Sequence, residues 1–180
     1  MASAHEFTTD PEHMRAAFSG FPSGVVAIAT LVGAEPVIMI ASSFTVGVSY
    51  RPPMVSFAVQ RGSTTWPLLS GAPVLGISLL SEVHAGKTRQ LASRNKQDRL
   101  RGIGTTGTAS GAVFLDDAPS WLECAVEHRY PAGDHEIVVL RVLAMSNDHS
   151  SHPLVWHRKQ PKVLQPIPGS APNGTVAQGC

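Results

Sequence analysis

The apolar run GVVAIATLV at residues 24–32 is rich in β-branched side chains. Such a run predicts a β-strand that is buried on both faces. The GAEP that follows is typical of a hairpin turn and leads into a second apolar segment at residues 37–41. Further segments of strand character lie at residues 54–59, 74–79, 121–130 and 136–145. These six extended segments predict a mainly β fold, a β-barrel with a few short helices.

Helical patterning is limited to two stretches. Asp10 and Pro11 are typical of a helix start, and the apolar residues 14, 17 and 18 recur at helical spacing, so a short helix is predicted that ends at Gly20. Residues 82–97 contain good helix formers with only a thin apolar stripe. They predict the main helix, lying on the surface.

Length and composition predict one domain with a flexible segment at each terminus. A chain of 180 residues is long enough for a self-supporting core. The last 16 residues, QPIPGSAPNGTVAQGC, are dominated by Pro, Gly and small polar residues, which bury too little apolar area to offset the entropy of ordering. We expect a flexible N-terminus at 1–9, the domain at 10–164 and a disordered tail at 165–180.

The charge balance argues against two classes of partner. Lys and Arg number 14 against 13 Asp and Glu, which leaves no basic field for nucleic acid or anionic lipid. Residues 1–10 do not resemble a signal peptide, and no apolar run reaches the ~18 residues of a membrane span. Cys124 lies in an apolar segment and Cys180 is the last residue, so no disulfide framework is expected. A cytoplasmic location, without nucleic acid or membrane partners, is the expectation.

One motif invites a dinucleotide-binding interpretation. GIGTTG at residues 102–107 matches G-x-G-x-x-G. The fingerprint requires a buried strand before it and a helix after it, because the pyrophosphate sits on the helix N-terminus. Neither the preceding QDRLR nor the following TASG has that pattern, and a loop is predicted instead.

Other catalytic signatures are missing from the sequence. His149 and His152 lie in a polar loop without a third ligand, so no metal site is expected. No G-x-S-x-G elbow or Walker loop occurs, which leaves hydrolase and nucleotide triphosphatase functions unsupported.

Small hydroxyl residues follow the second predicted strand. Ser42, Ser43 and Thr45 would present hydroxyls and backbone amides at a strand end, with Phe44 as an apolar wall. A planar heteroaromatic ring such as isoalloxazine suits those groups. The alternative is an ordinary serine-rich turn, which is the simpler interpretation of these residues alone.

A second polar cluster, QRGSTTW at residues 60–66, follows the predicted strand at 54–59. Arg61 offers a charged fork and Ser63 and Thr65 offer hydroxyls, ahead of a predicted short helix whose N-terminus would add amides. This combination predicts a phosphate site. A capped helix with a solvated arginine is the alternative.

Gly133, Asp134 and His135 break the apolar pattern between two predicted strands. A histidine at such a hairpin mouth could hydrogen-bond a flavin edge or a nicotinamide carboxamide, and its pKa allows it to change charge near neutrality. The alternative is a turn with an exposed histidine.

In this order, the segments resemble the flavin reductase domain family, the small reductase components of two-component flavin-dependent monooxygenases. The resemblance covers residues 14–158 and is carried by FPSGV, ASSFT followed by VS and PP, RGSTTW, the pair Asp98-Arg99, WLEC, GDH and WHR. It implies an FMN-binding split barrel that is homodimeric, with the flavin near the subunit interface.

The resemblance also implies roles for particular residues. The isoalloxazine would lie against residues 42–45, with residues 22–25 nearby and residues 156–158 closing the pocket. The phosphate would be bound at residues 61–65, and the nicotinamide would face the 133–135 turn. The implied cofactor-binding residues are Pro22, Ser23, Gly24, Val25, Ser42, Ser43, Phe44, Thr45, Ser49, Arg61, Ser63, Thr65, Gly133, Asp134, Trp156, His157 and Arg158, with His135 as the catalytic candidate.

The implied activity is an NAD(P)H-dependent flavin reductase. Hydride would pass from nicotinamide C4 to flavin N5, and the protein would stack the two rings at reactive distance. FAD or FMN and NADH are the expected cofactors, and a separate oxygenase would take the reduced flavin. The alternative is a flavin-binding module, or a flavoprotein oxidase, that retains its flavin as a bound group.

Three departures from the family pattern stand out. One extra residue at Val46-Gly47 is compatible with a β-bulge beside the pocket. Asn95 and Lys96 replace apolar residues, and polar groups there would suit the adenylate of FAD. Ile38 stands where a glycine is common in the family, and the sequence offers no explanation for this difference.

Overall fold

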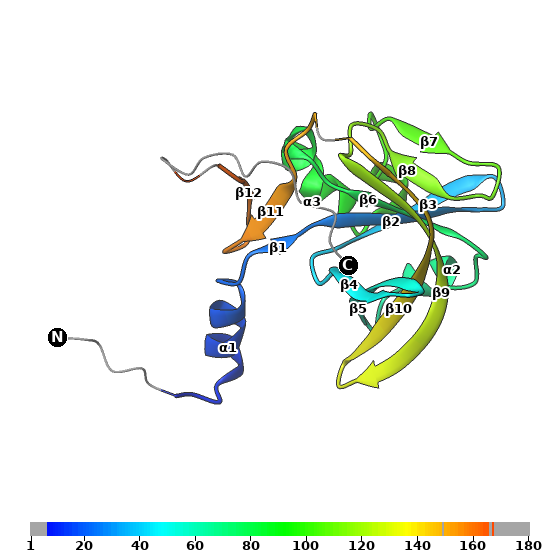
Figure 1. Cartoon of the computed structure of the whole chain (residues 1–180). Coiled ribbons are helices and arrows are strands. Elements are labelled where there is room, and N and C mark those ends of the chain that lie inside the picture. Colours follow the sequence, from blue (N-terminus) through cyan, green and yellow to red (C-terminus); the bar gives the residue numbers. More distant parts are fainter. Residues whose placement is uncertain (1–6, 149, 166, 168–180) are drawn as a thin grey trace.

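The structure, a computed structural model, describes residues 7–148, 150–165 and 167. One antiparallel sheet dominates it, with the strand order β3-β2-β6-β9-β10-β5-β4 (Figure 1). The mainly β prediction is therefore confirmed. The seven strands are β2 (Val26–Val32), β3 (Glu35–Ala41), β4 (Thr45–Tyr50), β5 (Pro53–Gln60), β6 (Leu75–Leu79), β9 (Ser120–Ala132) and β10 (His135–Asn147).

The barrel is not closed. Strands β3 and β4 are the two ends of the sheet order and do not pair with each other in the part of the chain described here. The end of β3 instead approaches β5 across a cavity. The strand-rich part of the prediction holds, whereas a closed ring of hydrogen bonds does not form within one chain.

Strand β2 explains why the apolar run is continuous. Its side chains alternate between two hydrophobic cores, because successive residues of a strand point to opposite faces. Val26 and Ile28 belong to the core inside the curved sheet, and Ala27 and Ala29 belong to the core on its outer face. The prediction of a strand buried on both faces is confirmed.

The inner core is plugged by a single helical turn. Helix α2 (Trp66–Leu69) inserts Trp66 and Leu69 among apolar side chains of the sheet, and the Trp66 ring meets Phe57 edge-on at 5.3 Å. The predicted short helix after residues 60–65 is therefore present, but it is only four residues long.

Two small sheets cover the outer core. One contains β1 (Ser23–Gly24), β11 (Leu154–His157) and β12 (Gln160–Val163), and the other contains β7 (Thr105–Gly107) and β8 (Val113–Leu115). Strand β8 crosses β6 so closely that a Cβ on Gly76 would lie 2.2 Å from the Val113 carbonyl oxygen. These strands have two to four residues each, which is too short for a periodic signal in the sequence.

The predicted helix over residues 82–97 is wrong as a single element. The structure has a 3₁₀ helix η1 (Glu82–Lys87), a one-turn helix α3 (Thr88–Leu91) and a second 3₁₀ helix η2 (Lys96–Asp98). Helices in proteins depend on a packed apolar face, and this stretch buries only Leu91 among its large apolar residues. Asn95 then caps η2 by accepting a hydrogen bond from the Gln97 amide.

Helix α1 (Pro11–Phe18) confirms the predicted N-terminal helix. Asp10 caps it by accepting the His13 amide hydrogen bond, and Pro11 occupies the first turn. None of its residues is buried, and it stands away from the sheets in Figure 1.

The expected bulge is observed, whereas the expected loop at residues 102–107 is only partly so. The register of β4 on β5 shifts between Thr45 and Ser49, and Gly47 adopts a φ of 71° there. The GIGTTG segment is not followed by a helix, because Thr105–Gly107 forms β7. The rejection of a dinucleotide fingerprint is therefore confirmed.

Three further expectations concern single residues and termini. Cys124 is fully buried, and burial raises the pKa of its thiol to about 12, as expected for a core residue. Cys180 and nearly all of the predicted flexible segments at 1–9 and 165–180 lie outside the described residues. No helix in the described ranges is long and apolar enough to cross a membrane.

A buried histidine joins η1 to the loop after β8. Nδ1 of His84 accepts a hydrogen bond from the Ser81 amide at 3.1 Å, so Nε2 carries the proton and donates to the Asp116 carbonyl at 3.0 Å. Burial lowers the pKa of His84 below its ordinary value. Protonation of Nδ1 would also place its N–H group opposite the N–H group of Ser81, so that hydrogen bond would be lost.

We therefore expect acid to destabilise the fold through His84. As the pH falls through about 6.5, the His84 imidazole binds a proton in the unfolded chain but stays neutral in the folded chain. The free energy of unfolding therefore decreases. His84→Asn should cost about 1–3 kcal/mol at neutral pH and flatten that decrease. Denaturant titrations at a series of pH values measure both effects. The exposed His152→Asn is the control, and an unchanged pH slope in His84→Asn would contradict the role.

Candidate functional site

A candidate site lies where the sheet fails to close. A cavity of about 510 Å³ opens between the end of β3 and the end of β5. Its walls include residues 39–43, 58–60 and 63–65, together with Arg99 and His135. This volume is in the range of small-molecule sites, and polar groups converge on a partly apolar floor.

Ser43 bridges the gap between the two strands. Its hydroxyl donates to the Ala58 carbonyl at 3.0 Å and accepts from the Ala58 amide at 2.9 Å. A single side chain therefore satisfies both backbone polar groups of Ala58. Ser43 thus has a structural role, as expected of a serine-rich turn, and it also lines the cavity in which a ligand could bind.

Ser63 and Thr65 both line the cavity, and both already accept hydrogen bonds. The Ser63 hydroxyl accepts from the amides of Thr65 and Trp66, at 3.3 and 3.1 Å, in the turn that leads into α2. The Thr65 hydroxyl accepts from Arg99 at 3.0 Å. Some of the helix-terminal amides expected to bind phosphate therefore already donate to Ser63. The hydroxyl groups of Ser63 and Thr65 donate to no described residue and can donate to a ligand.

Arg99 is the functional candidate that sequence reasoning left without a role. Its Nε donates to the Ser93 carbonyl at 2.7 Å, and its Nη1 donates to the Ile38 carbonyl at 2.6 Å as well as to Thr65. Burial lowers the pKa of this guanidinium. The Asp98-Arg99 pair was part of the family resemblance, and that was the available signal.

Arg61 lies elsewhere. It lines a neighbouring cavity of about 370 Å³ together with Trp66, Arg129 and Glu136. Gln60 and Ser63 line both this cavity and the main one. Arg129 binds Glu136 through two hydrogen bonds at 2.8 and 2.9 Å, and Trp66 donates to the same carboxylate. The residues that line the main cavity do not include Arg61.

His135 is presented to the main cavity by the β9–β10 hairpin. It is the first residue of β10 and pairs with Gln60 of β5, which brings the hairpin mouth beside residues 58–65. Its Nδ1 lies 2.7 Å from the Asp134 carboxylate. That contact lowers the pKa of Asp134, and since a carboxylate only accepts, Nδ1 carries the proton and Nε2 remains to interact with a ligand.

A second cavity of about 400 Å³ adjoins the first and shares Ile40, Ser42 and Ala92 with it. Trp156 supplies an aromatic wall. Arg89 and Lys159 also line it, and so does Val25, together with Thr88. The two cavities together form an extended site with one polar and one largely apolar half.

The remaining predicted residues are not among those that line these cavities. Ser23 and Gly24 pair with Trp156 and Val155 in the β1–β11 ladder, and Phe44 packs against the inner core. The other residues line none of the three cavities: Pro22 precedes β1, Thr45 and Ser49 lie on β4, Gly133 turns the β9–β10 hairpin with a φ of 62°, and His157 and Arg158 end β11 and begin its turn.

The comparisons with known proteins decide the family. The model of the flavin reductase like domain matches residues 18–165, which is most of the chain. The chain belongs to the flavin reductase family. The resemblance inferred from the ordered motifs is confirmed, although the comparisons do not test the individual site residues.

Relatives within the flavin reductase family carry informative names. An NADH:FMN oxidoreductase of Rhodococcus qingshengii is 34% identical and covers 86% of this chain and 81% of its own. The reductase component of 4-hydroxyphenylacetate 3-monooxygenase from Thermus thermophilus is 32% identical, covering 82% and 93%. The NADH:FAD oxidoreductase of Streptomyces globisporus C-1027, solved with NAD and FAD fragments, is 26% identical with a TM-score of 0.80, covering 92% and 100%.

The seam contact of Ser43 can be tested by stability. Ser43→Ala leaves the Ala58 amide and carbonyl without their partner, and we expect the free energy of unfolding to fall by about 1 kcal/mol. The neighbouring Ser42→Ala removes an equally exposed hydroxyl that has no hydrogen bond to the described residues, and it should change the free energy of unfolding by less than about 0.5 kcal/mol. Urea denaturation of the three proteins gives the values. Equal losses in both variants would show that Ser43 does not bridge the strands.

Proposed function

We propose that this protein is a cytoplasmic NAD(P)H:flavin oxidoreductase that reduces free FAD or FMN and supplies the reduced flavin to a partner monooxygenase. The observation that carries the proposal is the flavin reductase match over residues 18–165. NADH:FMN and NADH-dependent FAD reductases among the relatives support it, as does a monooxygenase reductase component.

The main cavity suits the flavin ring and its side chain. The ring would lie along Ser42 and Ser43, and the phosphate would lie near the hydroxyls of Ser63 and Thr65, which line the same cavity. Phe44 and Thr45, which were predicted beside the ring, do not line it. When bound, flavin supplies the hydride-accepting N5. The protein holds two flat rings in contact and excludes water between them, so its contribution is positioning rather than covalent chemistry.

His135 would orient the nicotinamide. Asp134 holds its Nδ1, so the imidazole presents Nε2 to the cavity. In its neutral form Nε2 accepts a hydrogen bond, which matches the N–H₂ of a carboxamide. The second cavity, with Trp156, offers room for the rest of the dinucleotide.

A homodimer is part of the same proposal. Large apolar side chains are exposed on α1 and β4, including Phe18 (67% exposed), Val46 (69%) and Tyr50 (82%). Exposed apolar patches of this kind mark protein interaction sites. A second copy that covers them would place the open side of the sheet next to a subunit interface.

The activity itself is the first test. The purified protein should oxidise NADH or NADPH only when FAD, FMN or riboflavin is added, and without oxygen the flavin absorbance should bleach in proportion. The protein should lose its flavin on gel filtration. A protein that stays yellow and turns over no added flavin would support the alternative of a retained, bound flavin. Absence of nicotinamide oxidation with all three flavins would refute the proposal.

His135 should affect one substrate more than the other. We expect His135→Ala to raise the KM for NADH by roughly tenfold, the worth of one hydrogen bond, and to change the KM for flavin by less. Asp134→Asn, which weakens the hold on Nδ1, should shift the same parameter by a smaller factor. Steady-state kinetics with each substrate varied in turn make the comparison. Equal changes in both KM values would argue against a nicotinamide-side role.

A further inference from the structure

The main cavity contains an arginine whose charge is not compensated. All three groups that accept from Arg99 are neutral, namely two backbone carbonyls and the Thr65 hydroxyl. No ion pair is formed by Arg99 within the described residues. A partly buried cation without an anionic partner favours binding of an anion from solution.

The guanidinium is held rigidly, with one side left open. A guanidinium has five N–H donors, of which Nε uses one and Nη1 uses two in the bonds described above. The two donors of Nη2 have no partner among the described residues, and Arg99 lines the cavity. These two N–H groups sit on one nitrogen and diverge, so each can donate a separate charge-assisted hydrogen bond to an anion such as a phosphate.

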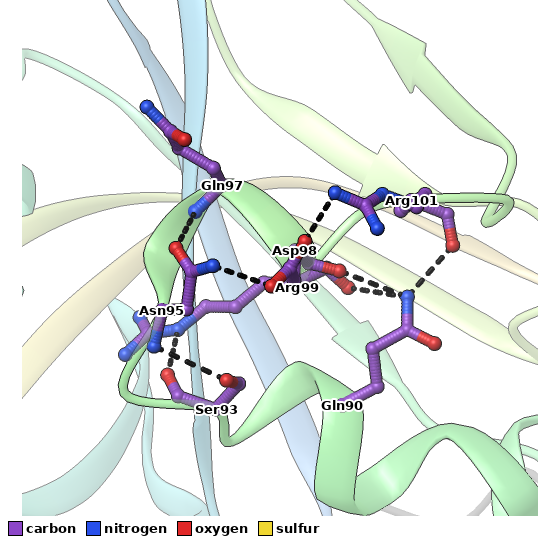
Figure 2. Close-up of polar contacts among 7 residues, drawn as sticks. All are labelled: Gln90, Ser93, Asn95, Gln97, Asp98, Arg99 and Arg101. Carbon is purple, nitrogen blue, oxygen red and sulfur yellow. Dashed lines mark hydrogen bonds and ion pairs between the residues drawn. The ribbon is translucent and has the colours of Figure 1, made fainter.

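The segment that carries Arg99 is braced internally, as Figure 2 shows. The Gln90 amide group donates to the carbonyls of Asp98, Arg99 and Arg101. Asn95 donates to the Asp98 carboxylate, which also pairs with Arg101. The nearest carboxylate along the chain is thus engaged with other partners, and the backbone beneath Arg99 is fixed.

Two hydroxyl groups complete the donor set. Ser63 and Thr65 have their oxygens occupied as acceptors, and neither donates its proton to any described residue. Both line the cavity together with Arg99. Arg61, by contrast, lines the neighbouring cavity with Glu136, whose pKa is lowered mainly by the hydrogen bond from Arg129 and least by the charge of Arg61.

We propose that Arg99, together with Ser63 and Thr65, binds the phosphate of the flavin nucleotide, and that Arg61 does not. The proposal rests on the proposed function, because it names the residue that recognises the phosphate of the flavin substrate. It assigns to Arg99 a double role: Nε and Nη1 tie the edge of β3 to the 93–101 segment, and Nη2 contacts the ligand.

The test compares flavins with and without a phosphate. FMN carries it and riboflavin lacks it, so loss of a phosphate contact must be selective. We expect Arg99→Gln to raise the Kd for FMN by about 10- to 100-fold, as for a charge-assisted hydrogen bond, and the Kd for riboflavin by less than about threefold. Titration followed by flavin fluorescence measures both constants without any turnover. The KM values for the two flavins should follow the same pattern.

Two further variants separate phosphate binding from a purely structural role. Arg99→Lys keeps the charge and should retain part of the preference for FMN, even if Arg99→Gln folds poorly. Arg94→Ala removes an equal charge from an exposed position of the same segment and should leave the preference intact. Melting temperatures of all variants show which of them remain folded.

Three outcomes would overturn the inference. One is an equal loss of FMN and riboflavin binding in both Arg99 variants, which would reduce Arg99 to a positioning residue. Another is a phosphate-selective loss in Arg61→Ala in place of the Arg99 variants. The third is a wild-type protein that binds riboflavin as tightly as FMN. Binding of FMN through Arg99 without nicotinamide oxidation would instead refute the proposed function and leave this inference standing.

Discussion

The structure depends on how the open seam between β3 and β5 is satisfied. Backbone groups at a sheet edge need partners, and here no strand pairs with the outer edge of β3 in the described chain. Side chains take that place: Ser43 bonds both backbone groups of Ala58, and Arg99 bonds the Ile38 carbonyl. A side-chain bridge spans a larger distance than a direct backbone hydrogen bond, and only a few such bridges occur here. The strands are therefore farther apart than paired strands would be. The space they leave is the main cavity.

The same constraint brings the candidate site residues together. Pairing of β10 with β5 sets His135 opposite Gln60, so the histidine at the hairpin mouth lies at the head of the segment that contains Ser63 and Thr65. The Arg99 bond to Thr65 then joins that segment to the loop after α3. Four regions that are distant in sequence therefore meet at one cavity, and each arrives through backbone pairing or a side-chain bond that also stabilises the fold.

The elements that could be predicted from the sequence are those specified by residues close together in the chain. The β2 run, the capped helix α1 and the β9–β10 turn are specified by neighbouring residues, and they were predicted correctly. The 82–97 helix failed because its formation required tertiary packing that only Leu91 provides. Arg61 stands only two residues before Ser63 but does not line the main cavity, whereas Arg99, 34 residues from Thr65, does. Composition and periodicity contain no information about that contact.

Net charge and local charge lead to different conclusions about partners. The chain as a whole carries a formal charge of +1, which argues against a surface that attracts polyanions. Recognition of one phosphate group needs no such field. It needs a cation that has been partly desolvated, fixed in direction and left without a carboxylate partner, and Arg99 meets each condition through bonds to neutral acceptors alone. Because those bonds leave the positive charge uncompensated, the interactions that hold the seam together are also the ones that make it an anion site.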